Sequence, residues 1–307
     1  MRTHTTRAAR LVAALAVTGL AVTACGSEDS SSTGSGGSST DAAGGGTVTL
    51  GFLPSWTDGL STAHLWDHVL TEEGYDVEMQ EINDPGPLYE GLSSGAVDVY
   101  PSGWPEVTHA QYMDRYGDEV EDLGAWYEGA QLTLAVPEYT DITSIADLQG
   151  QADRFGGRIV GIEPGAGLTT QVQDTAMPAY GLDGEYTLQT SSTTAMLAEL
   201  QSATDAQEDV VVTLWRPFWA NSEFPVKDLE DPEGAMGEAE GLHTLARTGF
   251  SDDMPDVAAM MESFSLTDEQ YGELENMVVN EYGEGRYEEA VDAFFAANPD
   301  VMESLTS

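Results

Sequence analysis

Hydrophobic positions change their spacing repeatedly along the chain. Residues 47–52 (TVTLGF) form a short apolar run, residues 62–70 place apolar side chains at helical spacing, and residues 75–82 alternate apolar with polar positions. These patterns predict a strand, a helix and a second strand. The alternation continues, with strands predicted at 97–100, 132–136, 158–162, 210–214 and 242–247, helices at 87–94, 144–148, 168–176 and 194–203, and helical structure from 256 to 305.

Strands that alternate with helices predict an α/β protein with a mainly parallel sheet covered on both faces. A chain of 307 residues is long enough for two lobes. We expect residues 47–135 together with 243–307 to form lobe 1, and residues 136–242 to form lobe 2. The chain would then pass twice between the lobes, and a cleft between lobes is a preferred place for a small-ligand site.

The first 24 residues have the three-part layout of a secretory signal peptide. A basic leader is followed by an apolar run at 11–22, which is too short to span a bilayer, and by small residues up to Ala24. Cys25, the only cysteine, stands where bacterial lipoproteins carry their lipidated cysteine. The alternative is an ordinary signal peptide followed by an incidental cysteine. The resemblance to lipoproteins implies that Cys25 is lipidated. Residues 25–46 hold mostly Gly, Ser, Thr and Ala, which predicts a disordered tether after it.

The charge balance excludes one class of partner. The chain has 54 acidic and 10 basic residues, a formal net charge of -44. Basic patches supply the affinity of proteins for nucleic acid, so we expect no nucleic-acid partner. The acidic residues are spread along the chain, which indicates a well-solvated surface. Adaptation to salty surroundings, where screening relieves self-repulsion, is a second explanation that remains open.

Three tryptophans stand where predicted strands end. Trp56 follows the strand at 47–52, Trp104 follows 97–100, and Trp215 follows 210–214. Strand ends commonly face the ligand cleft in such folds, although a single tryptophan is most often a packing residue. Three at equivalent strand ends predict an aromatic cage.

Longer segments of the chain match a known family. They are LWDHVLTEEGYDV, GAVDVYPSGWPEVTH, GIEPGAGL, SSTTAMLAEL, VVVTLWRPFW and LEDPEGAMGEAE. The sequence resembles the substrate-binding proteins of quaternary-amine (glycine betaine/proline betaine) ABC importers from Val48 to about Phe295. The resemblance implies a two-lobed periplasmic-binding-protein fold (type II-like) with the ligand cleft between the lobes. It also implies an extracytoplasmic, membrane-anchored bacterial receptor without catalysis or cofactor, whose partners are a quaternary amine and an ABC permease.

The resemblance also implies roles for individual residues. Trp56, Trp104 and Trp215 take the positions of the family's prism around the trimethylammonium group, and the backbone of Gly161 and Ile162 with His109 takes the positions that bind the carboxylate. By itself the segment GIEPGAG, between a strand and a helix, fits either an anion site or a plain turn. Relatives often carry histidine where Phe218 stands. Choline, carnitine and proline betaine remain alternative ligands, and a sensory lipoprotein remains an alternative role.

Enzymatic and metal-binding motifs do not fit their contexts. Residues 91–95 match the GxSxG string of esterases, but a predicted helix precedes them and a strand follows, the reverse of a nucleophile elbow. His64 and His68 have helical i, i+4 spacing without the glutamate of a zinc protease. We therefore expect neither an enzyme nor a metal site.

Overall fold

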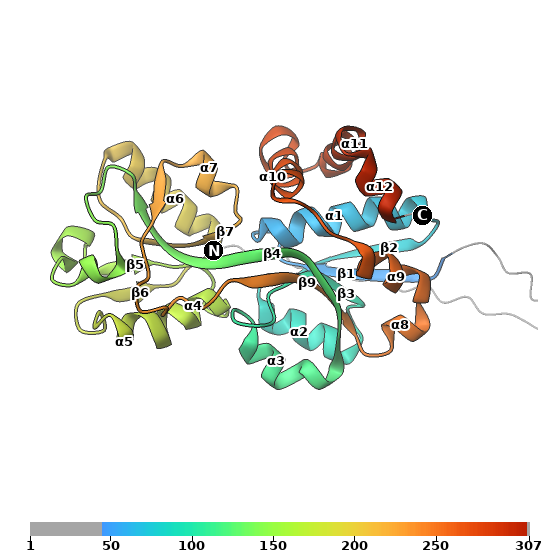
Figure 1. Cartoon of the computed structure of the whole chain (residues 1–307), viewed down its shortest axis with the longest axis horizontal. Coiled ribbons are helices and arrows are strands. Elements are labelled where there is room, and N and C mark those ends of the chain that lie inside the picture. The colour runs from blue at the N-terminus through green and yellow to red at the C-terminus, as the bar shows by residue number, and fades with distance from the viewer. Residues whose placement is uncertain (1–44, 306–307) are drawn as a thin grey trace, which may run out of the picture. The chain divides into compact units, whose positions relative to one another are not determined.

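The computed structural model describes residues 45–305, and these form a sheet of nine strands with helices on its faces (Figure 1). The order across the sheet is β2-β1-β3-β9-β4-β7-β5-β6, and β8 pairs with β4. The strands are β1 (Thr47–Phe52), β2 (Asp76–Glu81), β3 (Val99–Gly103), β4 (Val120–Pro137), β5 (Arg158–Val160), β6 (Thr187–Gln189), β7 (Val212–Arg216), β8 (Val226–Asp228) and β9 (Glu240–Arg247). The predicted signal peptide, Cys25 and almost all of the predicted tether lie outside the described residues.

Helices cover the sheet in both halves of the described chain. Those near β1–β3 are α1 (Thr57–Glu72), α2 (Pro85–Ser94), α3 (Ala110–Tyr116), α8 (Phe250–Asp253), α9 (Pro255–Ser263), α10 (Asp268–Asn276), α11 (Tyr287–Ala297) and α12 (Pro299–Leu305). Those near β5–β7 are α4 (Gly167–Gln171), α5 (Met177–Ala179), α6 (Thr193–Ala206) and α7 (Ala220–Glu223). A π-helical segment, Val172–Ala176, joins α4 to α5. Within residues 45–305 no helix combines the length and apolar character that crossing a bilayer requires.

Strand β4 connects two lobes. Its residues from Val120 to Ala130 pair with β9, whereas those from Gln131 to Pro137 pair with β7 and β8. The chain returns to the first group of strands at Glu240, where β9 begins. We therefore define lobe 1 as residues 45–130 with 240–305, and lobe 2 as residues 131–239. The sequence boundaries at 135 and 243 fall inside β4 and β9, because a continuous strand carries no break in its pattern.

The sheet is mixed, so the expectation of a mainly parallel sheet is wrong for its centre. Strand β1 pairs in parallel with β2 and β3, and β5 pairs in parallel with β6 and β7. The pairs β3–β9, β4–β9, β4–β7 and β4–β8 are antiparallel. The cause is the connection between lobes: β4 takes the chain into lobe 2 and β9 brings it back, so these neighbours run in opposite directions (Figure 1).

Most predicted elements are present, with shifts at their ends. The first half of β4 and the short strands β6 and β8 were not predicted. Strand β6 is only three residues long, and two of its side chains are exposed, so it lacks the apolar run that signals a strand. The predicted helix at 144–148 is a 3-10 turn over Ile145–Leu148. A turn this short cannot be distinguished from an α-helix by apolar spacing.

Two other tryptophans are core residues of lobe 1. Trp66 and Trp126 are almost completely buried, and each packs against Phe264 with ring centroids 5.2 and 5.7 Å apart. The indole Nε1 of Trp126 also donates to the carbonyl oxygen of Pro101 at 2.8 Å. Replacing either ring would leave a large cavity in the core, so these tryptophans serve stability.

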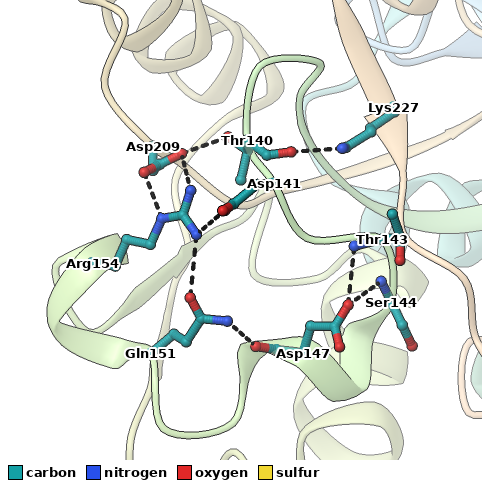
Figure 2. Close-up of polar contacts among 9 residues, drawn as sticks. All are labelled: Thr140, Asp141, Thr143, Ser144, Asp147, Gln151, Arg154, Asp209 and Lys227. Atoms are coloured by element: carbon teal, nitrogen blue, oxygen red, sulfur yellow. Dashed lines mark hydrogen bonds and ion pairs between the residues drawn. The ribbon is translucent and has the colours of Figure 1, made fainter.

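Basic side chains, rare in this chain, organise the outer surface of lobe 2. Arg154 donates to Asp209 at 2.6 Å and to Asp141 at 2.5 Å, and Thr140 Oγ1 donates to the same Asp209 at 2.6 Å (Figure 2). Lys227 Nζ donates to the carbonyl oxygen of Thr140 at 2.6 Å. Exposed ion pairs contribute little one by one. Together these bonds tie the segment after β4 to β8 and to the segment before β7.

Candidate ligand-binding site

A buried cavity lies between the lobes, next to β3, β5 and β7. Its volume is about 30 Å³, far below the about 300–1,000 Å³ of typical small-molecule sites. Lobe 1 lines it with Trp56, Asp58, Trp104, Thr108 and His109, and lobe 2 with Leu132, Ile162, Ala166, Gly167, Leu168 and Trp215. Five of the six predicted ligand-binding residues are therefore brought together. Gly161 is the exception.

The three predicted tryptophans reach the cavity from different elements. Trp56 directly precedes α1, and Trp104 directly follows β3. Trp215 lies inside β7, paired with Leu132 of β4, so it does not stand past a strand end as the sequence suggested. The apolar run at 210–214 placed the strand two residues too early. All three rings are at most 7% exposed, so a ligand between them would be removed from water.

Asp58 is a cavity residue that the sequence analysis missed. It lies in the first turn of α1, is buried, and its Oδ2 accepts hydrogen bonds from Trp104 Nε1 at 3.0 Å and Ser102 Oγ at 2.6 Å. Burial raises the pKa of Asp58, and the two hydrogen bonds oppose that rise. The available signal was an acidic residue two positions after Trp56. Because the indole N–H of Trp104 donates to Asp58, this hydrogen bond fixes the orientation of the indole ring.

The indole of Trp56 is held from the opposite lobe. Its Nε1 donates to Glu163 Oε2 of lobe 2 at 3.2 Å. The imidazole of His109 lies nearly parallel to the same indole, with ring centroids 5.7 Å apart and an interplanar angle of 15°. Glu163 is the second residue that the sequence analysis missed, and only the meeting of the lobes brings it to Trp56.

Trp215 is supported by Phe218, the position where relatives often carry histidine. The two rings stack with centroids 4.0 Å apart and an interplanar angle of 22°. Phe218 is itself buried and does not line the cavity. Its apolar ring therefore fixes the orientation of Trp215 from behind, and a polar side chain at this position is not needed for that task.

The hydrogen bonds of His109 select one tautomer. Its Nδ1 lies 3.1 Å from the backbone N of Trp104 and 2.9 Å from the hydroxyl of Tyr89. A backbone N–H can only donate, so Nδ1 is an acceptor and the ring proton resides on Nε2. Burial lowers the pKa of His109 to about 3, so the ring is neutral at physiological pH. His109 therefore offers a neutral Nε2–H donor.

The predicted pair of backbone donors is only partly available. The amide of Gly161 donates to the carbonyl oxygen of Gln189 at 2.9 Å, as a continuation of the sheet, and Gly161 does not line the cavity. Ile162 does line it. Beyond Ile162, the lobe 2 backbone nearest the cavity belongs to Ala166 and Gly167, where α4 begins. The anion-binding backbone expected at Gly161 and Ile162 is thus reduced to Ile162 in this arrangement.

The lobes approach each other most closely at Gly167. A Cβ atom on Gly167 would lie 1.6 Å from the carbonyl oxygen of Thr108, a backbone atom of lobe 1. Nearby, Tyr112 Oη donates to the carbonyl oxygen of Gly165 at 2.7 Å across the same boundary. Only glycine permits this approach.

Two α/β lobes joined by crossing strands, with a buried cavity lined by both, define a two-lobed solute-binding protein. Residues 46–297 match the model of the substrate-binding domain of ABC-type glycine betaine transport systems, and the chain belongs to this family. The family consists of transport receptors and not enzymes.

Known relatives agree with this assignment. The glycine betaine/carnitine transport binding protein GbuC of Listeria monocytogenes is 37% identical over 150 residues, which is 48% of this chain and 48%, about half, of that relative. The ProX protein of Borrelia burgdorferi has a solved structure with 31% identity and a TM-score of 0.79 over 85% of this chain and 97% of its own. Lactococcal OpuAC, closed on glycine betaine, gives 26% identity and a TM-score of 0.78 over 85% and 99%.

We predict that Gly167→Ala prevents the lobes from meeting, because the added methyl group would collide with the backbone of Thr108. Small-angle scattering with and without glycine betaine, the solute after which the family is named, measures the closure. The variant should keep a larger radius of gyration when the solute is added. Gly184→Ala in lobe 2 is the control, because a methyl group there meets nothing within 4 Å. Equal compaction of Gly167→Ala and wild type would contradict the assignment of this contact.

Proposed function

We propose that the chain is the extracytoplasmic receptor of an ABC importer and captures glycine betaine or a closely related quaternary-ammonium osmoprotectant. One observation carries this proposal: three tryptophans from both lobes line one buried cavity. The indole N–H groups of two of them, Trp56 and Trp104, donate to a carboxylate. The faces of these two rings are their remaining means of binding a ligand.

A quaternary ammonium group suits such a cavity. It cannot donate a hydrogen bond, so cation–π attraction and dispersion are the available forces, and each desolvated ring contributes up to about 2 kcal/mol. Asp58 lies in the wall of the cavity; burial raises its pKa, and its two hydrogen bonds oppose that rise. When ionised, its carboxylate adds negative charge close to the ligand's cation.

Donors in the same cavity favour a ligand that also carries an anion. His109 supplies its Nε2–H as a donor, and Ile162 supplies its backbone N–H. Charge-assisted hydrogen bonds to a carboxylate are stronger than bonds to a neutral hydroxyl. This supports glycine betaine, and proline betaine shares both ends of that molecule. The solved lactococcal relative is in complex with glycine betaine.

A choline or carnitine receptor of the same fold is the second candidate. Asp58 is the observation that favours it, because a buried carboxylate can accept a hydrogen bond from a ligand hydroxyl. The Listeria relative is named for carnitine as well as glycine betaine. The two candidates share the tryptophan cage and differ in the ligand's second polar group. A carboxylate would accept from His109, whereas a hydroxyl could donate to Asp58.

We predict that Trp56→Ala, Trp104→Ala and Trp215→Ala each weaken glycine betaine binding at least about tenfold in calorimetry, because each removes one aromatic face. Tyr139→Ala is the control, since Tyr139 is an exposed aromatic residue that does not line the cavity. Trp66 and Trp126 are unsuitable as controls because they stabilise the core. The isostere 3,3-dimethylbutanoate, which keeps the carboxylate but has an uncharged quaternary carbon in place of the ammonium nitrogen, should bind wild type far more weakly than glycine betaine. Equal affinities would exclude cation–π recognition.

We predict that wild type binds glycine betaine about ten- to a hundredfold more tightly than choline, and that His109→Ala narrows this ratio mainly by weakening glycine betaine. Because the pKa of His109 is about 3, its contribution should not change between pH 5 and 8. Calorimetric affinities for both ligands at these pH values make the comparison. Tighter binding of choline by wild type would instead favour the second candidate.

We further propose that Cys25 carries a lipid that holds the receptor at the outer face of the cell membrane, beside the permease of its transporter. The support is the layout of residues 1–25. We expect wild type to partition with membranes, since the several acyl chains of a lipoprotein hold firmly where one chain binds only marginally. Cys25→Ser should be released or keep its leader. A freely secreted wild type with an unmodified thiol would refute the anchor.

A further inference from the structure

We propose that Glu163 positions the cage: it holds Trp56 only when the lobes meet, and it couples their closure to the positive charge of the ligand. This inference rests on the proposed function, because it presupposes a cationic ligand. Glu163 lies in lobe 2, between β5 and α4, and is 6% exposed. Its carboxylate accepts four hydrogen bonds.

Each carboxylate oxygen of Glu163 accepts one hydrogen bond from each lobe. Oε1 accepts from Ser55 Oγ of lobe 1 at 3.2 Å and from the backbone N of Thr193 at 2.9 Å. Oε2 accepts from Trp56 Nε1 of lobe 1 at 3.2 Å and from Thr193 Oγ1 at 2.8 Å. If the lobes separate, the two bonds from Thr193 remain within lobe 2 and the two from lobe 1 are lost. The orientation of Trp56 therefore depends on closure.

The charge of Glu163 has no basic partner. No ion pair in residues 45–305 includes Glu163, and all four of its donors are neutral. Closing the lobes removes this carboxylate from water, and burying an unpaired charge opposes closure. Glu163 does not itself line the cavity but accepts a hydrogen bond from the edge of Trp56, which does, so a cation in the cavity would lie near this carboxylate and offset that opposition. A bound cation thus favours the closed arrangement, and a molecule of the same shape without the positive charge does not.

Glutamine cannot replace Glu163 in this arrangement. Each oxygen accepts from one N–H whose direction is fixed, Thr193 N on Oε1 and Trp56 Nε1 on Oε2, and from one hydroxyl that can rotate. Whichever way the amide of glutamine turns, its NH₂ group faces one of the two N–H donors. Glu163→Gln therefore removes the negative charge and loses one of the fixed hydrogen bonds, with almost no change in shape.

The test is a double-mutant cycle in the full chain carrying Cys25→Ser. Calorimetry with glycine betaine and with 3,3-dimethylbutanoate is done on the parent protein, Glu163→Gln, Trp56→Phe and the double variant. We expect Glu163→Gln to weaken glycine betaine binding at least about tenfold and the isostere much less, and to have little further effect once Trp56→Phe has removed the indole N–H. The control is Glu208→Gln, which makes the same charge change on the exposed surface of lobe 2.

A purely structural role for Glu163 is excluded by a second measurement. The ligand-free melting temperature of Glu163→Gln should match that of Glu208→Gln, because the lobe 1 bonds are needed only for closure. Wild-type affinity in Glu163→Gln, an equal loss for both ligands, or effects of Glu163→Gln and Trp56→Phe that simply multiply would overturn the proposal.

A third measurement separates this proposal from the proposed function. If the parent protein binds neither glycine betaine, choline nor carnitine, the proposed function fails. The closure role is then judged by spin labels at Ser94→Cys in lobe 1 and Gln173→Cys in lobe 2, both exposed positions. In ligand-free protein, Glu163→Gln should show a larger short-distance component than the parent protein, because the unpaired charge that opposes closure is gone. Identical distributions would refute the role of the Glu163 charge in closure.

Discussion

The direction in which each indole N–H points is the constraint on which the candidate site depends. A tryptophan has one polar group, and when that group is satisfied by a buried carboxylate the ring can no longer turn. Trp104 is fixed in this way by Asp58 from the same lobe, and Trp56 by Glu163 from the other. In the described part of the chain Trp215 makes no indole bond of this kind, and its ring stacks on Phe218. In the proposed cage, Trp104 and Trp215 are therefore held within their own lobes, whereas Trp56 is held across the lobes.

Strands β4 and β9 run between the lobes, and Trp56 of lobe 1 reaches its partner Glu163 of lobe 2 only through the meeting of the two lobes. Strand β4 runs through both lobes: its first half pairs with β9 and its second half with β7. The lobes therefore share a hydrogen-bonded backbone connection. The cavity lies between the lobes, beside Leu132 of β4. The backbones of the two lobes approach closely there, at Gly167 and Thr108. The contacts between the lobes include two buried carboxylates, Glu163 beside Trp56 and Glu275 beside the backbone of Trp219.

The acidic composition gives the interior charges added weight. On lobe 2, Arg154 is committed to Asp209 and Asp141, and the single lysine of the chain donates to a backbone carbonyl. Asp58 and Glu163 therefore receive neutral donors where many proteins would supply arginine. Within residues 45–305 no lysine or arginine lines this cavity, and we propose that the carboxyl groups of Asp58 and Glu163 favour a ligand that brings a positive charge.

The sequence by itself determined the α/β class and most elements, and it predicted Trp56, Trp104, Trp215 and His109, which the structure brings to one cavity; their roles in binding stay predictions. Apolar periodicity and long family segments are local signals, and a ring or an imidazole is recognisable wherever it stands. It missed Asp58 and Glu163, because an acidic residue among 54 carries no mark of burial. It overestimated Gly161, whose amide is used by the sheet.

Only the tertiary structure decided the mixed sheet, the lobe boundaries within β4 and β9, and the pairing of Trp56 with Glu163. These features join residues far apart in the chain, and Trp56 and Glu163 are 107 positions apart. The tautomer of His109 was also decided there, since it depends on the hydroxyl of Tyr89 and on a backbone N–H. A local pattern cannot report on partners that only the meeting of two lobes supplies.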